Sequence, residues 1–211
     1  NRNRKAKKRA IMRFSKIISV ILHPVFMPIV TVYLILSLFP SIGFLITHHL
    51  NFIYLILFFS TIVIPLVSIL FLIKINVVSS LEMPNYKERF FPLFLTVISM
   101  VLGYYILEEI LIFSTLLKDS MIGAIIIVFI SLIISKYWKI SLHMLGVGGV
   151  VGVLFSLNFL YGGLLNILIV FIFIAGLLGV ARIQEKAHNN IQVYSGFIIG
   201  AFVELYFILL F

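Results

Sequence analysis

The chain has 211 residues, of which 63% are hydrophobic and 11% are charged, and its mean hydropathy is +1.24. Soluble domains carry about 25% charged residues, so this composition excludes an ordinary soluble protein and indicates an integral membrane protein. The net charge of +9 comes mostly from an N-terminal run, which is typical of membrane topology and not of nucleic-acid binding. Cysteine is absent, which excludes a disulfide framework and a thiolate metal site.

The apolar segments define the fold class. About 20 apolar residues cross a bilayer as a helix, so the length allows six to seven spans. Strands of a membrane barrel would alternate polar and apolar residues, whereas these segments are apolar on all sides. We therefore predict an all-α, polytopic transmembrane helix bundle, with residues 17–211 as a single domain in the phospholipid bilayer.

Residues 1–16 form a basic N-terminal segment with eight lysines and arginines and no acid. We interpret it as a cytoplasmic anchor beside anionic lipid. A signal peptide is disfavoured because no small-residue cleavage site closes the next apolar run. That run is the first span, about 17–39, and its His23-Pro24 and Pro28 predict a kinked or partly unwound first half.

The remaining spans follow in order. Their predicted limits are about 52–73, 91–113, 121–135, from 143 onward, 164–180 and 191–211. Pro65 predicts a kink in the second span. The fourth span is expected to continue through Tyr137 and Trp138, which suit the membrane interface, and Lys118-Asp119 are expected in the turn before it. The glycines of the fifth span permit close helix packing, and Glu204 in the last span must face protein, water or an interface.

Three polar segments interrupt the spans, at residues 81–92, 136–143 and 181–192. With seven spans, these segments and the N-terminus lie on the same face of the membrane. Lys118 is the only lysine or arginine in the opposite loops, so the positive-inside rule predicts a cytoplasmic location for all three segments.

The third polar segment has the densest chemistry. Arg182 offers a planar fork of donors that suits phosphate oxygens, and His188 can be a nucleophile, a base or a ligand. Gln192 follows His188 by four residues, so on a helix the two side chains share a face. Taken alone, such a segment is also typical of a short solvated loop with snorkelling cations.

Taken together, the three segments suit a phosphate group. The candidate residues are Arg89, Lys139, Ser141, His143, Arg182 and His188. Phosphoryl transfer needs positive charge on the equatorial oxygens and groups in line for attack and departure. Two histidines can divide that work, one attacking phosphorus and the other protonating the leaving oxygen. No acidic metal cluster accompanies them, so we expect a mechanism without metal or cofactor.

These residues resemble the motifs of the type 2 phosphatidic acid phosphatase superfamily, integral membrane lipid phosphatases related to vanadium haloperoxidases. Arg182 and His188 keep the arginine-to-histidine spacing of that family's third motif. Ser141 and His143 match the serine and histidine of the second motif, and Arg89 is the best match for the arginine of the first. The resemblance covers roughly residues 74–211, and the motif wording is most similar to Bacteroidetes-type members.

The resemblance implies an enzyme of a bacterial inner membrane that hydrolyses a lipid phosphate or pyrophosphate monoester through a phosphohistidine. It implies that His188 is the nucleophile and His143 the general acid. It also implies that Arg89 and Arg182 clamp the phosphate, with help from Ser141. No nucleic acid partner is expected.

Several positions depart from the family pattern. Gln192 stands where an aspartate orients the nucleophilic histidine; its carbonyl can hold the imidazole tautomer but cannot stabilise the imidazolium as a carboxylate does. Glu82 occupies the position of the first motif's lysine, so Lys87 or Lys139 would have to substitute. Glu185 is a second candidate for the missing acid. These departures leave a second hypothesis open, a weakened or inactive lipid-phosphate-binding protein of the same fold. A transporter, suggested by the broken first span and Glu204, is a third.

Overall fold

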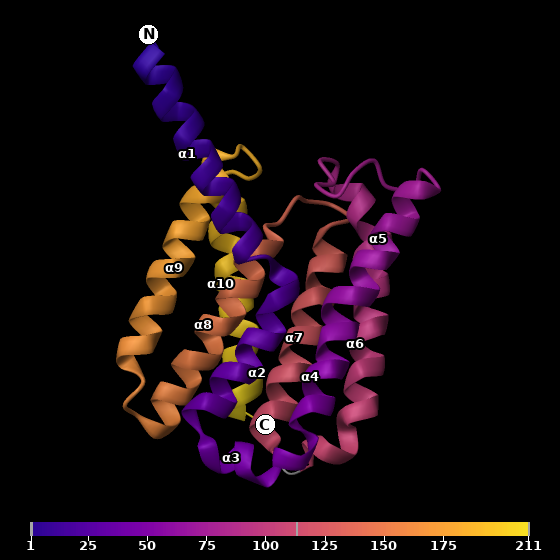
Figure 1. Ribbon diagram of the computed structural model, residues 1–211, viewed down its shortest axis with the longest axis vertical. Coiled ribbons are helices and arrows are strands. Elements are labelled where there is room, and N and C mark those ends of the chain that lie inside the picture. The colour runs from indigo at the N-terminus through magenta and orange to yellow at the C-terminus, as the bar shows by residue number, and fades with distance from the viewer. Residues whose placement is uncertain (1, 113, 211) are drawn as a thin grey trace.

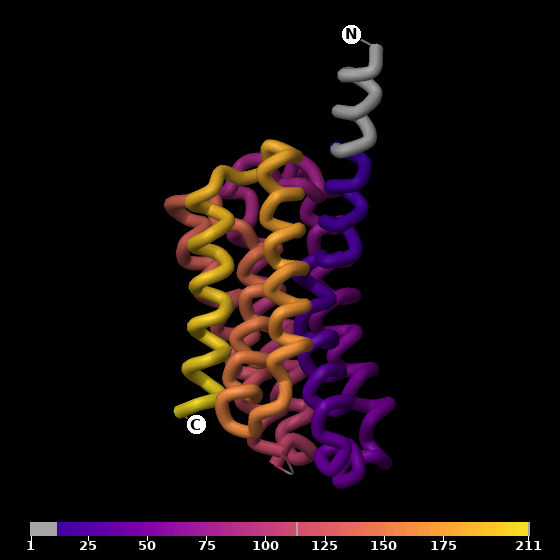
Figure 2. The backbone as a smooth tube through the Cα atoms, turned by 90° about the vertical axis from the view of Figure 1, so that its left-hand side faces the viewer, coloured from indigo at the N-terminus to yellow at the C-terminus, as the bar shows by residue number. Residues whose placement is uncertain are grey.

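The structure, a computed structural model, describes the backbone of residues 2–112 and 114–210 and the side chains from Met12 onward. Every regular element in these residues is a helix, which confirms the predicted all-α bundle. Seven segments of the described chain are long and apolar enough to cross a membrane. They are Met12–Leu38, Thr47–Lys74, Tyr86–Leu111, Thr115–Ile134, Leu142–Tyr161, Leu165–Gln184 and Asn190–Leu210. Figures 1 and 2 show them side by side along one long axis.

The first span is broken, as its prolines predicted. Helix α1 (Arg2–Ile21) ends before His23, and the 3-10 turn η1 (Pro24–Phe26) leads into α2 (Met27–Leu38). His23 has an extended backbone, with φ −67° and ψ 138°. The cause is local, because a proline disfavours the helical conformation of the residue before it. Residues 2–16 of the basic segment lie in α1, and the side chains before Met12 are outside the described residues.

The second span contains an irregular turn next to its proline. Two short helices, α3 (Pro40–Leu45) and η2 (Thr47–His49), lead from the first span to α4 (Leu50–Phe58). A π-helical turn, η3 (Phe59–Val63), then joins α4 to α5 (Ile64–Lys74). Pro65 has no N–H to donate to the preceding turn, and a widened turn accommodates that loss within a continuous span.

The remaining helices are η4 (Tyr86–Arg89), α6 (Phe90–Leu111), α7 (Thr115–Ile134), α8 (Leu142–Tyr161), α9 (Leu165–Gln184) and α10 (Asn190–Leu210). The fourth span differs from its prediction. It starts at Thr115 because the Ser114 side chain caps it, accepting the Leu117 N–H at 3.3 Å, so Lys118-Asp119 lie in helix and not in a turn. It ends at Ile134 and does not continue through Tyr137 and Trp138. The predicted span ends at residues 113 and 211 lie outside the described residues.

Helix α8 is the most buried of the seven spans, and it packs in parallel against α10. Cβ atoms added to Gly148 and Gly152 of α8 would meet the backbone carbonyls of Phe197 and Ala201 on α10. A Cβ on Gly200 of α10 would likewise meet the carbonyl of Leu145. The glycines therefore let the two backbones approach to direct contact, as predicted for the fifth span. This contact holds the first turn of α8 next to the first turn of α10.

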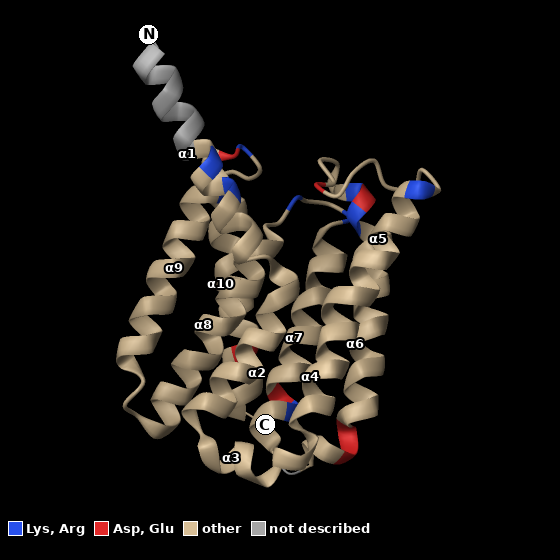
Figure 3. Cartoon of the chain, in the orientation of Figure 1, with Lys and Arg blue, Asp and Glu red and all other residues tan. Residues whose placement is uncertain are grey.

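The charged residues divide between the two ends of the bundle. Lysine and arginine gather at the end where α1 begins (Figure 3). The connections α5–η4, α7–α8 and α9–α10 lie at that same end (Figure 1), and they contain the three polar segments found in the sequence. This common location agrees with the prediction that seven spans place the three polar segments and the N-terminus on one face of the membrane. Glu204 is instead buried inside the bundle, 2% exposed, against Gly123 and Gly149.

Candidate functional site

Two hydrogen bonds join the three polar segments. Arg89, at the start of α6, is 5% exposed, and its Nη1 donates to the carbonyl oxygen of Ile140 at 3.0 Å. The next residue, Ser141, donates its backbone N–H to the carbonyl of Gln192 at 3.4 Å. The segment before α8 therefore lies between the first segment and the third.

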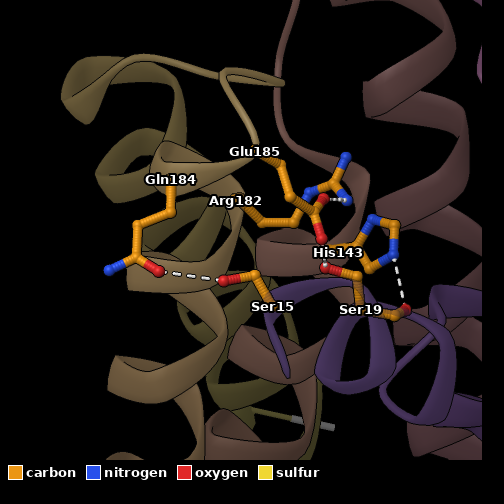
Figure 4. Close-up of polar contacts among 6 residues, drawn as sticks. All are labelled: Ser15, Ser19, His143, Arg182, Gln184 and Glu185. Atoms are coloured by element: carbon orange, nitrogen blue, oxygen red, sulfur yellow. Dashed lines mark hydrogen bonds and ion pairs between the residues drawn. The ribbon is translucent and has the colours of Figure 1, made fainter. Parts of the chain in front are cut away.

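Arg182 lies on the last turn of α9, which extends to Gln184 and so beyond the predicted end of the sixth span at about residue 180. Its Nη1 donates to Glu185 Oε2 at 2.7 Å, and the other oxygen of Glu185 accepts from Ser19 Oγ of α1 at 3.1 Å. In Figure 4 this pair lies close to His143, which projects from the first turn of α8. His143 Nε2 is 3.0 Å from the carbonyl oxygen of Ser19. Since a carbonyl only accepts, Nε2 carries the proton.

The tautomer of His188 follows from the start of α10. Asn189 Oδ1 accepts the Gln192 N–H at 2.9 Å, and Gln192 Oε1 accepts the Asn189 N–H at 3.2 Å. This reciprocal pair is a capping box, and it identifies the amide atom facing Asn189 as the oxygen. His188 Nδ1 lies 3.0 Å from the same oxygen and must donate to it. Neutral His188 therefore has its lone pair on Nε2.

The surroundings of His188 keep it neutral. The pKa of His188 is lowered to about 4: burial is the largest cause, the hydrogen bond to Gln192 opposes it, and the charges of Arg89, Arg182 and Lys139 add smaller lowering effects. The pKa of Lys139 is lowered by burial first and then by the charges of Arg89 and Arg182. His143 interacts electrostatically with Arg182 and His188. Arg89, Lys139, Arg182 and His188 thus lie within electrostatic reach of one another, and His143 lies within reach of Arg182 and His188.

Three buried donors in this cluster have no partner among the described residues: Nε of Arg89, Nε of Arg182 and Oγ of Ser141. Each arginine has its Nη1 bonded to the protein, which leaves the edge formed by Nε and Nη2. Ser141 is fully buried at the start of α8, and its hydroxyl does not cap the helix. Buried polar groups are normally satisfied, so these donors suit the oxygens of an anion at this place.

One candidate from the sequence is exposed. Lys87 is not among the residues whose charges act on His188, and the contact described for it is made by its backbone N–H, which donates to Asn85 Oδ1 at 3.1 Å. Glu185, considered as a substitute for the missing aspartate, bonds Arg182 and Ser19.

Sequence reasoning missed the part played by α1. Ser15 Oγ donates to Gln184 Oε1 at 2.9 Å, and Ser19 contacts both Glu185 and His143. The ring of His23 lies 5.1 Å from that of His143. Ser15 and Ser19 are four residues apart and so share one helix face. In a segment that is otherwise basic and apolar, this polar spacing was the signal that α1 contacts the polar segments.

Comparisons with protein-family models, curated proteins and solved structures find no match to this chain. The resemblance to type 2 phosphatidic acid phosphatases therefore stays a prediction made from its motifs.

Proposed function

We propose that the protein is an integral membrane phosphatase that hydrolyses a lipid phosphate or pyrophosphate monoester through a phosphohistidine at His188. One observation carries the proposal. Arg89 and Arg182, each with a buried Nε that has no partner among the described residues, act electrostatically on a histidine whose lone pair is on Nε2, and the unpartnered buried hydroxyl of Ser141 belongs to the residue whose N–H binds the Gln192 carbonyl.

In the first step, Nε2 of His188 attacks phosphorus and the bond from phosphorus to the lipid oxygen breaks. Because Nε2–H of His143 is held by the Ser19 carbonyl, His143 acts as the general acid in its doubly protonated form and gives the Nδ1 proton to the leaving oxygen; in the second step it takes that proton back from the attacking water. Arg89, Arg182 and Lys139 balance the charge on the equatorial oxygens, and Ser141 donates to one of them. In the second step, water attacks the phosphohistidine, which releases inorganic phosphate and restores His188.

A lipid substrate fits the position of the cluster. It lies at one end of a bundle of membrane-spanning segments, where the headgroups of a bilayer would be. A mostly apolar groove of about 410 Å³ lies between α1 and α9, and Ala181 and Gln184 are among its lining residues. The excess of lysine and arginine at this end supports a cytoplasmic location, in an inner membrane, under the positive-inside rule.

Phosphate release from lipid phosphates in detergent micelles tests the function. We expect the wild-type protein to release phosphate and His188→Gln to fall to background, because the nucleophile is lost. Lys87→Ala is the matched control: it removes an exposed cation that is not among the charges acting on His188, so it should retain activity. Equal release by wild type and His188→Gln would contradict the proposal.

A second function, binding of lipid phosphate without turnover, is favoured by Gln192. Replacing the orienting acid of a serine protease with its amide costs about 10⁴ in turnover, and Gln192 is such an amide. A binder would hold phosphate-bearing vesicles through Arg89 and Arg182 but release no phosphate. In that case Gln192→Glu, which restores a carboxylate, should create activity.

A further inference from the structure

Glu185 is the acidic residue bonded directly to the candidate phosphate clamp. Its Oε2 accepts from Arg182 Nη1 at 2.7 Å, and its Oε1 accepts from Ser19 Oγ at 3.1 Å. The side chains of Arg182 and Glu185 are 15% and 18% exposed. Because both carboxylate oxygens are bonded to different helices, the negative charge is fixed beside the cluster.

This carboxylate reduces the positive charge that the cluster offers. Arg89, Lys139 and Arg182 are cations within reach of His188, which is itself neutral near pH 7 because its pKa is about 4. With Glu185 counted, the cluster has a net charge of about two. A phosphate monoester, with a second pKa of about 6, carries nearly two negative charges at pH 7 and matches it. A pyrophosphate monoester carries more charge than this cluster balances.

Glu185 also limits the number of donors. A guanidinium has five N–H donors, and Glu185 Oε2 accepts from one of the two on Nη1 of Arg182. The Nε and Nη2 edge that remains can hold one phosphoryl group in the bidentate manner. A second phosphoryl group would need the Nη1 side, where the carboxylate would repel it.

We propose that Glu185 is a specificity-determining residue that makes this site selective for lipid phosphate monoesters over lipid pyrophosphates. The inference rests on the phosphate site of the proposed function but not on its turnover.

The experiment measures binding to two sets of vesicles that contain a lipid of the same chain with either a monophosphate or a pyrophosphate headgroup. Wild type should prefer the monophosphate. Glu185→Gln keeps the size and hydrogen bonding of the side chain but removes the charge, so the ratio of affinities should move toward pyrophosphate by about 10-fold. An unchanged ratio overturns the inference.

Two control variants separate the effect of the Glu185 charge from the effects of losing another acidic charge or the hydrogen bond to Ser19. Glu82 is exposed and interacts with Arg182 only at longer range, so Glu82→Gln should shift the ratio by less than about 2-fold. Ser19→Ala keeps the charge and removes its anchor, so the monophosphate preference should persist. If either control shifts the ratio as far as Glu185→Gln does, the inference is wrong.

The outcomes also separate this inference from the proposed phosphatase. Selective binding without phosphate release contradicts the phosphatase and supports the inference. Phosphate release with no dependence of headgroup preference on Glu185 supports the phosphatase and contradicts the inference. Absence of binding to either headgroup contradicts both.

Discussion

Gln192 Oε1 accepts a hydrogen bond from His188 Nδ1 at 3.0 Å while it caps the first turn of α10 through Asn189. The capping interaction at the start of α10 therefore also fixes the tautomer of His188, the candidate nucleophile. The glutamine orients the imidazole without supplying a charge to its protonated form, which agrees with a pKa of about 4 for His188.

Replacing this amide by a carboxylate should change the titration of His188. Gln192→Glu keeps the length of the side chain and adds a negative charge 3.0 Å from Nδ1, so the pKa of His188 should rise clearly above about 4. Titration of the imidazole by NMR measures this. Gln184→Glu is the control, because the Gln184 side chain bonds Ser15 instead, and it should leave the pKa of His188 nearly unchanged.

Acid should destabilise the protein through the same residue. The pKa of His188 is about 4 in the folded chain and about 6.5 in an unfolded one, so between these values the unfolded chain binds the proton first. Stability is therefore lost as the pH falls from 6.5 to 4, by about 3 kcal/mol from this group, and it falls no further below that pH. Thermal unfolding in detergent at pH 7 and pH 4.5 measures the loss. His188→Gln should lose less than wild type; an equal loss would contradict the assignment.

The fold was largely predictable because its causes are local. Hydropathy located the spans, and Pro24 and Pro65 marked the breaks in the first two. The fourth span was misplaced because the charges of Lys118-Asp119 were interpreted as a turn, although the Ser114 cap marked the true start. Charge in the first turns of a span is tolerated where the helix emerges from the membrane.

The site was predictable only as a set of residues. Arg89, His143 and His188 could be chosen by type and spacing, but their partners could not. The Ile140 carbonyl bound by Arg89 and the Ser19 contacts of α1 join residues more than 50 positions apart, which no local pattern encodes. The sequence also did not show which residue the Glu185 side chain contacts. Glu185 follows Arg182 by three residues and precedes His188 by three, so the spacing allowed a contact with Arg182 or with His188.

The α8–α10 contact should be intolerant of added volume. In Gly152→Ala the new Cβ meets the Ala201 carbonyl, a backbone atom that cannot rotate away, so we expect a loss of about 1–3 kcal/mol. Gly176→Ala is the matched control, because nothing lies within 4 Å of its added Cβ, and it should be neutral or slightly stabilising. The midpoint of thermal unfolding in detergent measures both. Equal effects would show that this contact is looser than described.

A lysine ammonium should not replace the paired Nε and Nη2 donors of Arg89 or Arg182 in binding phosphate. Arg89→Lys and Arg182→Lys keep the charge but lose the Nε and Nη2 pair, so each should weaken binding to phosphate-bearing vesicles by about 10-fold or more. Vesicle co-sedimentation measures the affinity. Lys87→Arg, the reverse exchange at an exposed residue whose charge is not among those acting on His188, serves as the control and should have no effect. Undiminished binding by both lysine variants would show that the edges do not hold the anion.

The most direct measurement is to trap the phosphoenzyme. The protein is mixed briefly with a lipid phosphate labelled at phosphorus, quenched in alkali, and analysed by mass spectrometry. If Nε2 of His188 is the nucleophile, as its bond to Gln192 indicates, the label will be found on His188 in wild type and will be missing in His188→Gln. Phosphate release that proceeds with no label on His188 would contradict the account.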